Sequence, residues 1–172
     1  TAVDPDRLWL YAPIQGAAAN AFGSNIFFSI QVILEARSNL NVTVSYSKRL
    51  DRRTSGALGD VVKNFGDRIN IVRKPTYQQR IASYVNHDWT FWSYHYDNSG
   101  VVPLESLCSG TPVITYSSYP MEEIILDGHN GAMIPTTVKF DNWDLPTLIE
   151  PSPKELVDGL RTTALDTALQ HR

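Results

Sequence analysis

Residues 97–118, DNSGVVPLESLCSGTPVITYSS, place two acidic residues on either side of a glycine and a short helical pattern. Seven residues separate Asp97 from Glu105, and Gly100 and Pro103 lie between them. Pro103 is expected in the first turn of a helix, where a missing N–H costs little. The apolar run 112–118 is expected to be a buried strand. This stretch therefore predicts a loop, a short helix and a strand in direct succession.

The rest of the chain repeats this alternation of strand and helix. Apolar and β-branched runs of strand length precede segments with helical periodicity. The expected strands are 8–13, 41–47, 69–74, 89–95, 112–118 and 131–135. The expected helices are 26–37, 54–66, 76–87, a short one after Gly100, 120–128 and 152–172. The order predicts an α/β fold with a doubly wound parallel six-stranded sheet, in which ligands bind beyond the carboxyl ends of the strands.

The length of 172 residues suits one domain. Residues 1–7 are expected to be a linker from a preceding domain, and 136–151 an irregular connection. The last helix is expected to begin after Ser152 as N-cap, with Pro153 in the first helical position.

Composition excludes several classes of protein. The net charge of -3 argues against a nucleic-acid partner, and no apolar stretch is long enough for a transmembrane segment. The histidines and the one cysteine are not at metal-ligand spacing, so no metal site is expected. Cys108 lies in an apolar helical stretch and is expected to be buried and inert.

The opening stretch has a specific binding chemistry. Ser99 and Gly100 precede a helix whose first N–H groups are unpaired, and such a helix end attracts phosphate. Asp97 and Glu105 carry carboxylates that accept hydrogen bonds from sugar hydroxyls. Phosphate between two sets of hydroxyls suits a nucleotide-sugar. The alternative is an ordinary polar turn followed by a solvated helical glutamate.

The letters D-N-S-G-V-V-P-L-E-S-L-C-S-G-T-P-V-I resemble the signature E-G-F-G-L-P-L-L-E-A-M-A-C-G-T-P-V-I of retaining glycosyltransferases with the GT-B fold. MEEIILDGHNGAMIP, residues 121–135, is similar to the pattern x-E-I-V-x-D-G-x-N-G-x-L-V-P of the same family, "glycosyl transferases group 1". The segment AVDPDRL near the start resembles the linker that enters the second domain of these enzymes. The resemblance implies the Rossmann-like C-terminal half of a GT-B fold, which binds the nucleotide-sugar donor.

The resemblance also implies a reaction: transfer of a hexose from a nucleoside-diphosphate sugar to a hydroxyl of a glycan, lipid or protein, with retention. No cofactor or metal is implied. An acceptor-binding domain would normally precede residue 1, and without it the chain is expected to have little or no transferase activity. The expected location is the cytoplasm, and contact with a membrane through the full-length protein stays open.

Position by position, the resemblance makes Asp97 the catalytic residue, which contacts hydroxyls of the sugar and lies near the anomeric carbon. It makes Glu105 the residue that holds the ribose hydroxyls, and it places the segment 72–76 along the base. The implied donor-binding residues are Glu105, Ser99, Gly100, Val101, Val102, Gly16, Lys48, Arg49, Arg73 and Thr76.

Two departures from the family pattern concern catalysis. Asp97 stands where the family usually has glutamate, and the loop after the first strand, IQGAAANAFGSN, lacks the usual arginine and lysine. Those cations stabilise the leaving diphosphate. Candidate substitutes follow the second strand: Lys48, Arg49, Arg52 and Arg53. The alternative is solvated surface charge. A non-catalytic nucleotide-sugar-binding or interaction module is therefore the second hypothesis. A nicotinamide-binding oxidoreductase is disfavoured because the first turn has no G-x-G-x-x-G.

Overall fold

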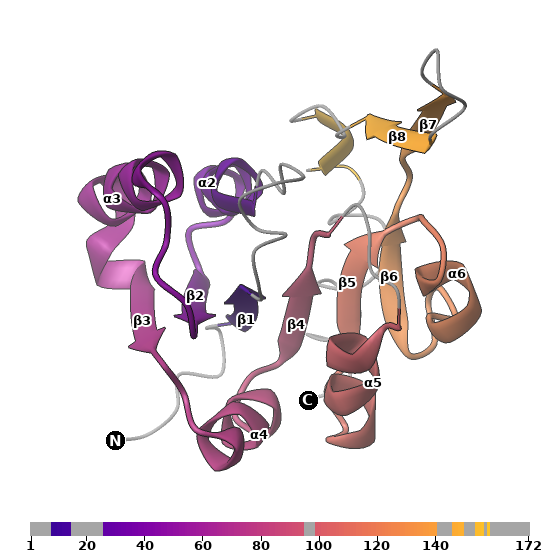
Figure 1. Cartoon of the computed structure of the whole chain (residues 1–172), viewed down its shortest axis with the longest axis horizontal. Coiled ribbons are helices and arrows are strands. Elements are labelled where there is room, and N and C mark those ends of the chain that lie inside the picture. Colours follow the sequence, from indigo (N-terminus) through magenta and orange to yellow (C-terminus); the bar gives the residue numbers. More distant parts are fainter. Residues whose placement is uncertain are drawn as a thin grey trace.

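A computed structural model describes residues 8–14, 26–94, 99–140, 146–149, 154–156 and 158 (Figure 1). Its centre is a six-stranded sheet in the order β3-β2-β1-β4-β5-β6, and every pair of neighbours is parallel. The strands are β1 Leu8–Ile14, β2 Leu40–Tyr46, β3 Ile69–Arg73, β4 Trp89–Trp92, β5 Val113–Tyr116 and β6 Gly131–Ile134. The predicted doubly wound parallel sheet is confirmed, with the order reversal between β1 and β4.

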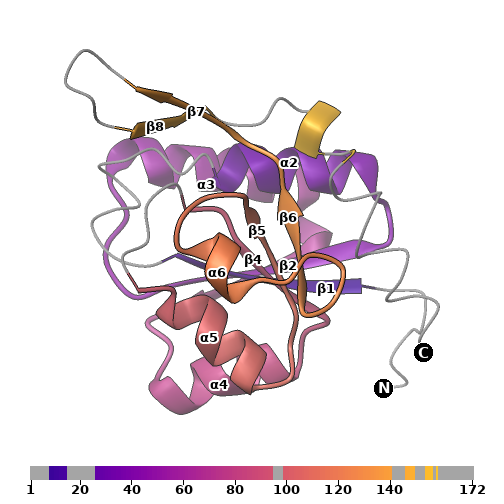
Figure 2. The same cartoon turned by 90° about the vertical axis from the view of Figure 1, so that its right-hand side faces the viewer.

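Helices cover both faces of this sheet (Figures 1 and 2). The helices α2 Ile26–Ala36 and α3 Arg52–Phe65 lie on one face; α4 Tyr77–Val85 and α5 Val101–Cys108 lie on the other. The short helix α6 Met121–Ile124 joins the second layer, since Met121 packs in the same apolar cluster as Val102 of α5. The 3₁₀ turn Gly66–Arg68 connects α3 to β3.

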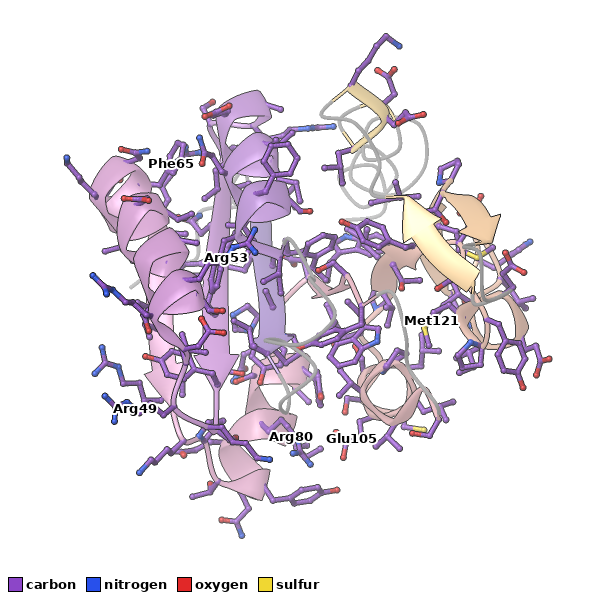
Figure 3. All side chains as sticks on the ribbon, turned by 45° about the horizontal axis from the view of Figure 1, so that its top comes forward. Arg49, Arg53, Phe65, Arg80, Glu105 and Met121 are labelled. Atoms are coloured by element: carbon purple, nitrogen blue, oxygen red, sulfur yellow. The ribbon has the colours of Figure 1, made fainter. Side chains whose placement is uncertain are left out.

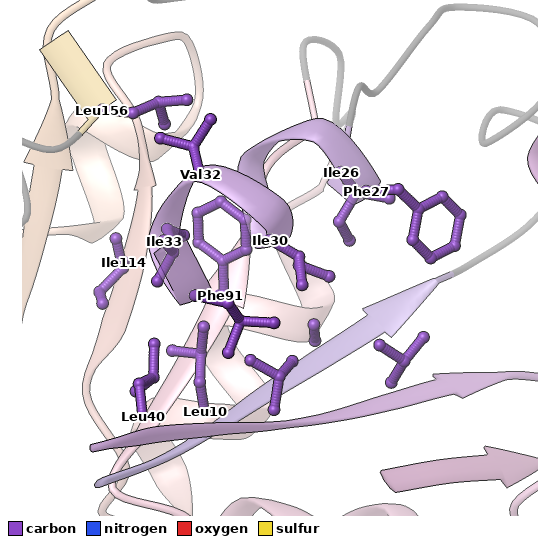
Figure 4. Close-up of a cluster of buried hydrophobic side chains, with 14 of the residues drawn as sticks. Leu10, Ile26, Phe27, Ile30, Val32, Ile33, Leu40, Phe91, Ile114 and Leu156 are labelled. Atoms are coloured by element: carbon purple, nitrogen blue, oxygen red, sulfur yellow. The ribbon is translucent and has the colours of Figure 1, made fainter. Parts of the chain in front are cut away.

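The core consists of two apolar layers because successive strand residues point to opposite faces. Leu10 and Ala12 of β1 pack with α2 and α3, whereas Tyr11 between them packs toward α4 and α5. Figure 4 shows the first layer, in which Phe91 of β4 lies below α2. Leu156 of the C-terminal segment is completely buried against this layer, so that segment contributes to the core.

Two of the helix boundaries that differ from the sequence predictions are decided by local caps. Helix α3 begins at Arg52, two residues earlier than expected, because Asp51 is its N-cap and accepts a hydrogen bond of 2.7 Å from the Thr54 N–H. Helix α6 ends at Ile124, well before the predicted end at 128. Asn130 stops it by accepting a hydrogen bond from the Leu126 N–H and donating one to the Ile124 carbonyl.

The stretch that was expected to be irregular contains two paired strands. β7 Thr137–Phe140 and β8 Pro146–Ile149 form an antiparallel ladder in which Thr137 is opposite Ile149. The alternation of polar and apolar residues in TVKF suits a strand, and Pro146 stands at the first position of β8, where proline is tolerated. Ser152 and Pro153, the expected start of the last helix, lie outside the described residues.

The expectation that Cys108 is buried is wrong. Its thiol is exposed at the end of α5. The buried face of this short helix consists of Val102, Pro103 and Ser106. Because each helical residue turns the side-chain direction by about 100 degrees, Cys108 falls on the opposite face from Ser106.

Candidate functional site

The edge of the sheet at the ends of β3 and β4 is where α4 and α5 begin (Figure 1). Gly100 is the N-cap of α5 and has a φ of +58°, in the left-handed region that glycine adopts without strain. A Cβ on Gly100 would also lie 2.2 Å from Cδ1 of Ile124. Gly100 is thus needed for the turn itself, which brings the N-terminus of α5 to this edge.

Glu105 is held by two side chains from the neighbouring helix α4. Its Oε1 accepts a hydrogen bond and ion pair from Nη2 of Arg80 at 3.0 Å. Its Oε2 accepts a hydrogen bond from the hydroxyl of Tyr84 at 3.2 Å. Figure 3 shows Arg80 of α4 and Glu105 of α5 side by side. The glutamate side chain is 19% exposed, so its carboxylate is fixed in place but remains open to solvent.

Tyr84 is the most constrained member of this group. Burial, followed by the nearby charge of Glu105, raises the pKa of the Tyr84 hydroxyl far above its ordinary value of 10.0. The Tyr84 ring makes an edge contact of 5.2 Å with Tyr11, and its carbonyl accepts a hydrogen bond from Thr111. Tyr84 therefore stays protonated at physiological pH and acts as a permanent donor to Glu105.

A basic pocket of about 990 Å³ opens at the ends of β2 and β3, beside the N-terminus of α3. The one acid in its lining, Asp51, is engaged in capping α3. Within the described part of the chain, none of the five basic residues of this pocket forms an ion pair. The lining residues are Tyr46, Ser47, Lys48, Arg49, Leu50, Asp51, Arg52, Ser55, Arg73 and Lys74.

Lys74 has an unusual backbone conformation at the rim of this pocket. Its φ of +50° lies in the left-handed region, which residues with a Cβ seldom adopt, and its N–H donates to the Tyr46 carbonyl at 2.7 Å. This hydrogen bond fixes the backbone at the end of β3. A lysine therefore occupies a backbone conformation in which glycine would be less strained.

The structure brings some predicted site residues together and leaves others apart. Lys48, Arg49 and Arg73 line the basic pocket, whereas Glu105 lies with Arg80. Thr76 is occupied as the N-cap of α4, in a capping box with Gln79. Ser99, Gly100, Val101 and Val102 form the entry to α5; the Val101 side chain is exposed, that of Val102 buried. Asp97 and Gly16 lie outside the described residues.

Sequence reasoning missed Arg80 and Tyr84, whereas Arg52 is among the expected substitute cations and Lys74 lies in the segment 72–76. The first two stand four residues apart in α4, so helical spacing places them on one face, and this signal was available. Their partner lies 25 residues later for Arg80, on another helix, and the pairing is visible only in three dimensions.

Within the described ranges, no cluster of three or more histidine, cysteine, aspartate or glutamate side chains is arranged to hold a metal ion. Among the same residues, no helix has both the length and the apolar character required to cross a membrane.

His87 is partly buried just beyond the end of α4. Its Nδ1 lies 2.6 Å from the Ser83 carbonyl and its Nε2 lies 2.7 Å from the Thr43 hydroxyl. Because a carbonyl only accepts, Nδ1 carries the proton and Nε2 accepts from Thr43. Trp9 and Tyr11 cover the ring. Burial lowers the pKa of His87 below its ordinary value of 6.5.

We expect acid to destabilise the fold through His87. The unfolded chain takes up a proton at His87 near pH 6.5, before the folded chain does, so this contribution to stability is present above pH 6.5 and is lost as the pH falls below it. Urea unfolding of the wild type and of His87→Gln between pH 7.5 and pH 5 should show a steeper decline for the wild type. Equal slopes would contradict the assignment of a neutral, partly buried His87.

Comparisons with solved structures identify the class of fold. The chain is similar to WaaG, "a glycosyltransferase involved in lipopolysaccharide biosynthesis", with a TM-score of 0.63 and 16% identity over 96% of this chain and 38% of that one. It is similar to HepE of Anabaena, solved with UDP and glucose, with a TM-score of 0.67 and 14% identity over 95% and 40%. The resemblance to GT-B glycosyltransferases is thus confirmed at the level of the fold.

A structure of one domain gives the same result. The C-terminal domain of a "Glycosyl Transferase Group 1 Family Protein (LpcC)" from Francisella tularensis matches with a TM-score of 0.60 and 20% identity, over 89% of this chain and 72% of that one. The chain spans well under half of the length of WaaG and HepE. Its fold therefore corresponds to part of those proteins and matches the separately solved C-terminal domain.

The sequence carries the family pattern in the region of the site. Residues 64–143 match the model of the family "Glycosyl transferases group 1". A search among curated proteins finds no match to the chain. The matched region extends from the end of α3 to just past β7.

Proposed function

We propose that this chain is the nucleotide-sugar-binding domain of a retaining hexosyltransferase. The domain would hold a nucleoside-diphosphate sugar at the carboxyl edge of the sheet, with the ribose at Glu105 and the phosphates at the N-terminus of α5. Asp97 would lie at the sugar end. The acceptor would be a hydroxyl of a glycan, lipid or protein, bound by a second GT-B domain of a cytoplasmic enzyme.

The observation that carries this proposal is the fixed carboxylate of Glu105 beside the N-terminus of α5. A helix end offers unpaired N–H groups to phosphate, and a carboxylate accepts hydrogen bonds from hydroxyls. Glu105 is presented by α5 itself, and its side chain is still 19% exposed. One ligand that carries both phosphate and a diol matches this pair of features. Calorimetric titration with UDP, GDP and their sugars tests the proposal.

The charge of the leaving diphosphate requires cations in addition to a helix end. Lys48 and Arg49 are our proposed source, and Arg52, Arg73 and Lys74 line the same pocket. Five basic side chains around one pocket repel one another, so an oxyanion bound there would relieve this repulsion. The proposal needs no metal or other cofactor, because side chains and the helix end would supply the positive charge.

Changing Lys48 and Arg49 together to alanine should weaken nucleotide-sugar binding about tenfold or more, with a shallower dependence on salt, because two charge-assisted contacts to phosphate are lost. The matched control is Arg53→Ala with Lys63→Ala, which removes the same charge from exposed positions of α3 outside the pocket. If the two double variants bind alike in calorimetry, Lys48 and Arg49 do not contact the diphosphate.

A non-catalytic nucleotide-sugar-binding or interaction module is the second candidate. The observation that favours it is the loop IQGAAANAFGSN, which contains no arginine or lysine. Donor hydrolysis or transfer by the full-length protein would exclude the non-catalytic module. The absence of all nucleotide binding would favour an interaction module.

A further inference from the structure

Two side chains of α4 converge on one carboxylate of α5. Arg80 and Tyr84 stand four residues apart, so both project from the same face of α4. Arg80 donates to Oε1 of Glu105 and Tyr84 donates to Oε2, so each oxygen has a separate protein donor. Neither residue is part of the motif that contains Glu105, which begins beyond the end of β4.

Arg80 is held in place on its other side. Its guanidinium lies over the ring of Tyr77, 5.2 Å from the ring centre, and the Arg80 side chain is 28% exposed. Its Nε atom is buried and has no hydrogen-bond partner among the residues that the structure describes. An unpaired buried N–H costs free energy, so the arginine is kept in this position at a cost to stability.

The remaining hydrogen-bonding capacity of Glu105 matches a specific group. An ionised carboxylate accepts at about four positions, two on each oxygen. Among the described residues, Arg80 and Tyr84 are the side chains that donate to these oxygens, one to each, so one accepting position remains on each oxygen. Two adjacent acceptors in a fixed plane suit two adjacent hydroxyls, such as the 2′ and 3′ hydroxyls of a ribose.

We propose that Arg80 and Tyr84 are positioning residues that orient the carboxylate of Glu105 toward a ribose diol and thereby set a preference for ribonucleotides over 2′-deoxyribonucleotides. This inference rests on the proposed function and adds the residues that determine its sugar specificity. Neither residue needs to touch the ligand. Without them, the free glutamate would have to be ordered when the ligand binds, at the cost of its side-chain entropy.

The test is calorimetric titration with UDP, 2′-deoxy-UDP, GDP and 2′-deoxy-GDP. We expect the wild type to bind the ribose form about tenfold more tightly than the deoxy form, for the loss of one charge-assisted hydrogen bond. Arg80→Leu should reduce this ratio about five- to tenfold, with Arg80→Lys restoring part of it. Tyr84→Phe, which keeps the buried ring, should reduce the ratio less. Gln78→Leu, an exposed change on the same helix, is the control.

Each other outcome overturns a defined part of the account. In one outcome, Glu105→Gln abolishes the preference for ribonucleotides over deoxyribonucleotides, whereas Arg80→Leu and Tyr84→Phe keep this preference. The positioning role is then wrong and the proposed function stands. If Arg80→Leu tightens the binding of UDP or GDP, Arg80 competes with the ligand and the positioning role is also wrong. If no nucleotide binds the wild type at all, both the positioning role and the proposed function fail.

Discussion

Gly131→Ala is expected to lower the free energy of unfolding by about 3 kcal/mol, at the upper end of overpacking effects. A Cβ on Gly131 would lie 2.3 Å from the Val113 carbonyl oxygen and 2.9 Å from Cγ2 of Ile125. The oxygen belongs to the backbone of β5, with which β6 pairs at this residue. Relief of the clash would therefore require the two strands to separate.

Urea unfolding followed by circular dichroism measures this effect. Gly59→Ala is the matched control, because a Cβ on Gly59 meets nothing within 4 Å and the residue lies within α3, where alanine is preferred. The control should be neutral or stabilising by up to about 1 kcal/mol. If the two variants unfold at the same urea concentration, Gly131 does not pack against β5 as closely as the structure shows.

The expected effect of Gly131→Ala also explains part of the family pattern in DGHNGAMIP. Asp127 accepts a hydrogen bond from the Met133 N–H, and Asn130 pairs with the backbone at Leu126 and Ile124. These contacts build the turn that leads into β6. The pattern is therefore structural at these positions, and it does not itself contact a ligand in our account.

Glu105→Ala is expected to weaken the binding of nucleotide-sugar on the order of 100-fold. Two charge-assisted hydrogen bonds to the ribose would be lost, at about 1.5 kcal/mol or more each. The change also leaves the half-buried guanidinium of Arg80 without its counterion, so a moderate loss of stability should accompany it.

Calorimetry at a temperature where the variant is folded separates binding from stability. Glu105→Gln keeps the shape of the side chain and should retain more stability while still losing most of the affinity. The control is Glu123→Ala, an exposed glutamate of α6. If both Glu105 variants bind nucleotide-sugar as tightly as the wild type, Glu105 does not bind the ribose.

The sequence predicted the sheet and its covering layers because hydrophobic runs of strand length alternate with helical periodicity throughout. The six strands fall within three residues of their expected bounds. Errors arose where a single cap decides a boundary, as Asp51 does for α3 and Asn130 does after α6. The pairing of β7 with β8 was missed because short strands of four residues give a weak periodic signal.

The candidate site was only partly predictable. Glu105 and Gly100 stand out in the sequence because a recognisable pattern contains them. Arg80 and Tyr84 do not, since their role depends on α4 lying against α5, a tertiary contact without a local signature. The basic pocket likewise joins the segment after β2 to Arg73 at the end of β3 and Lys74 next to it, because parallel pairing brings these two strand ends together.

Isothermal titration of the 172-residue chain with UDP, GDP and their sugars tests the central claim most directly, with Glu105→Gln measured in parallel. The account predicts saturable 1:1 binding of at least one nucleoside diphosphate by the wild type, and a loss of about tenfold or more in the variant. No binding by a folded wild-type chain, or equal binding by wild type and variant, would contradict it.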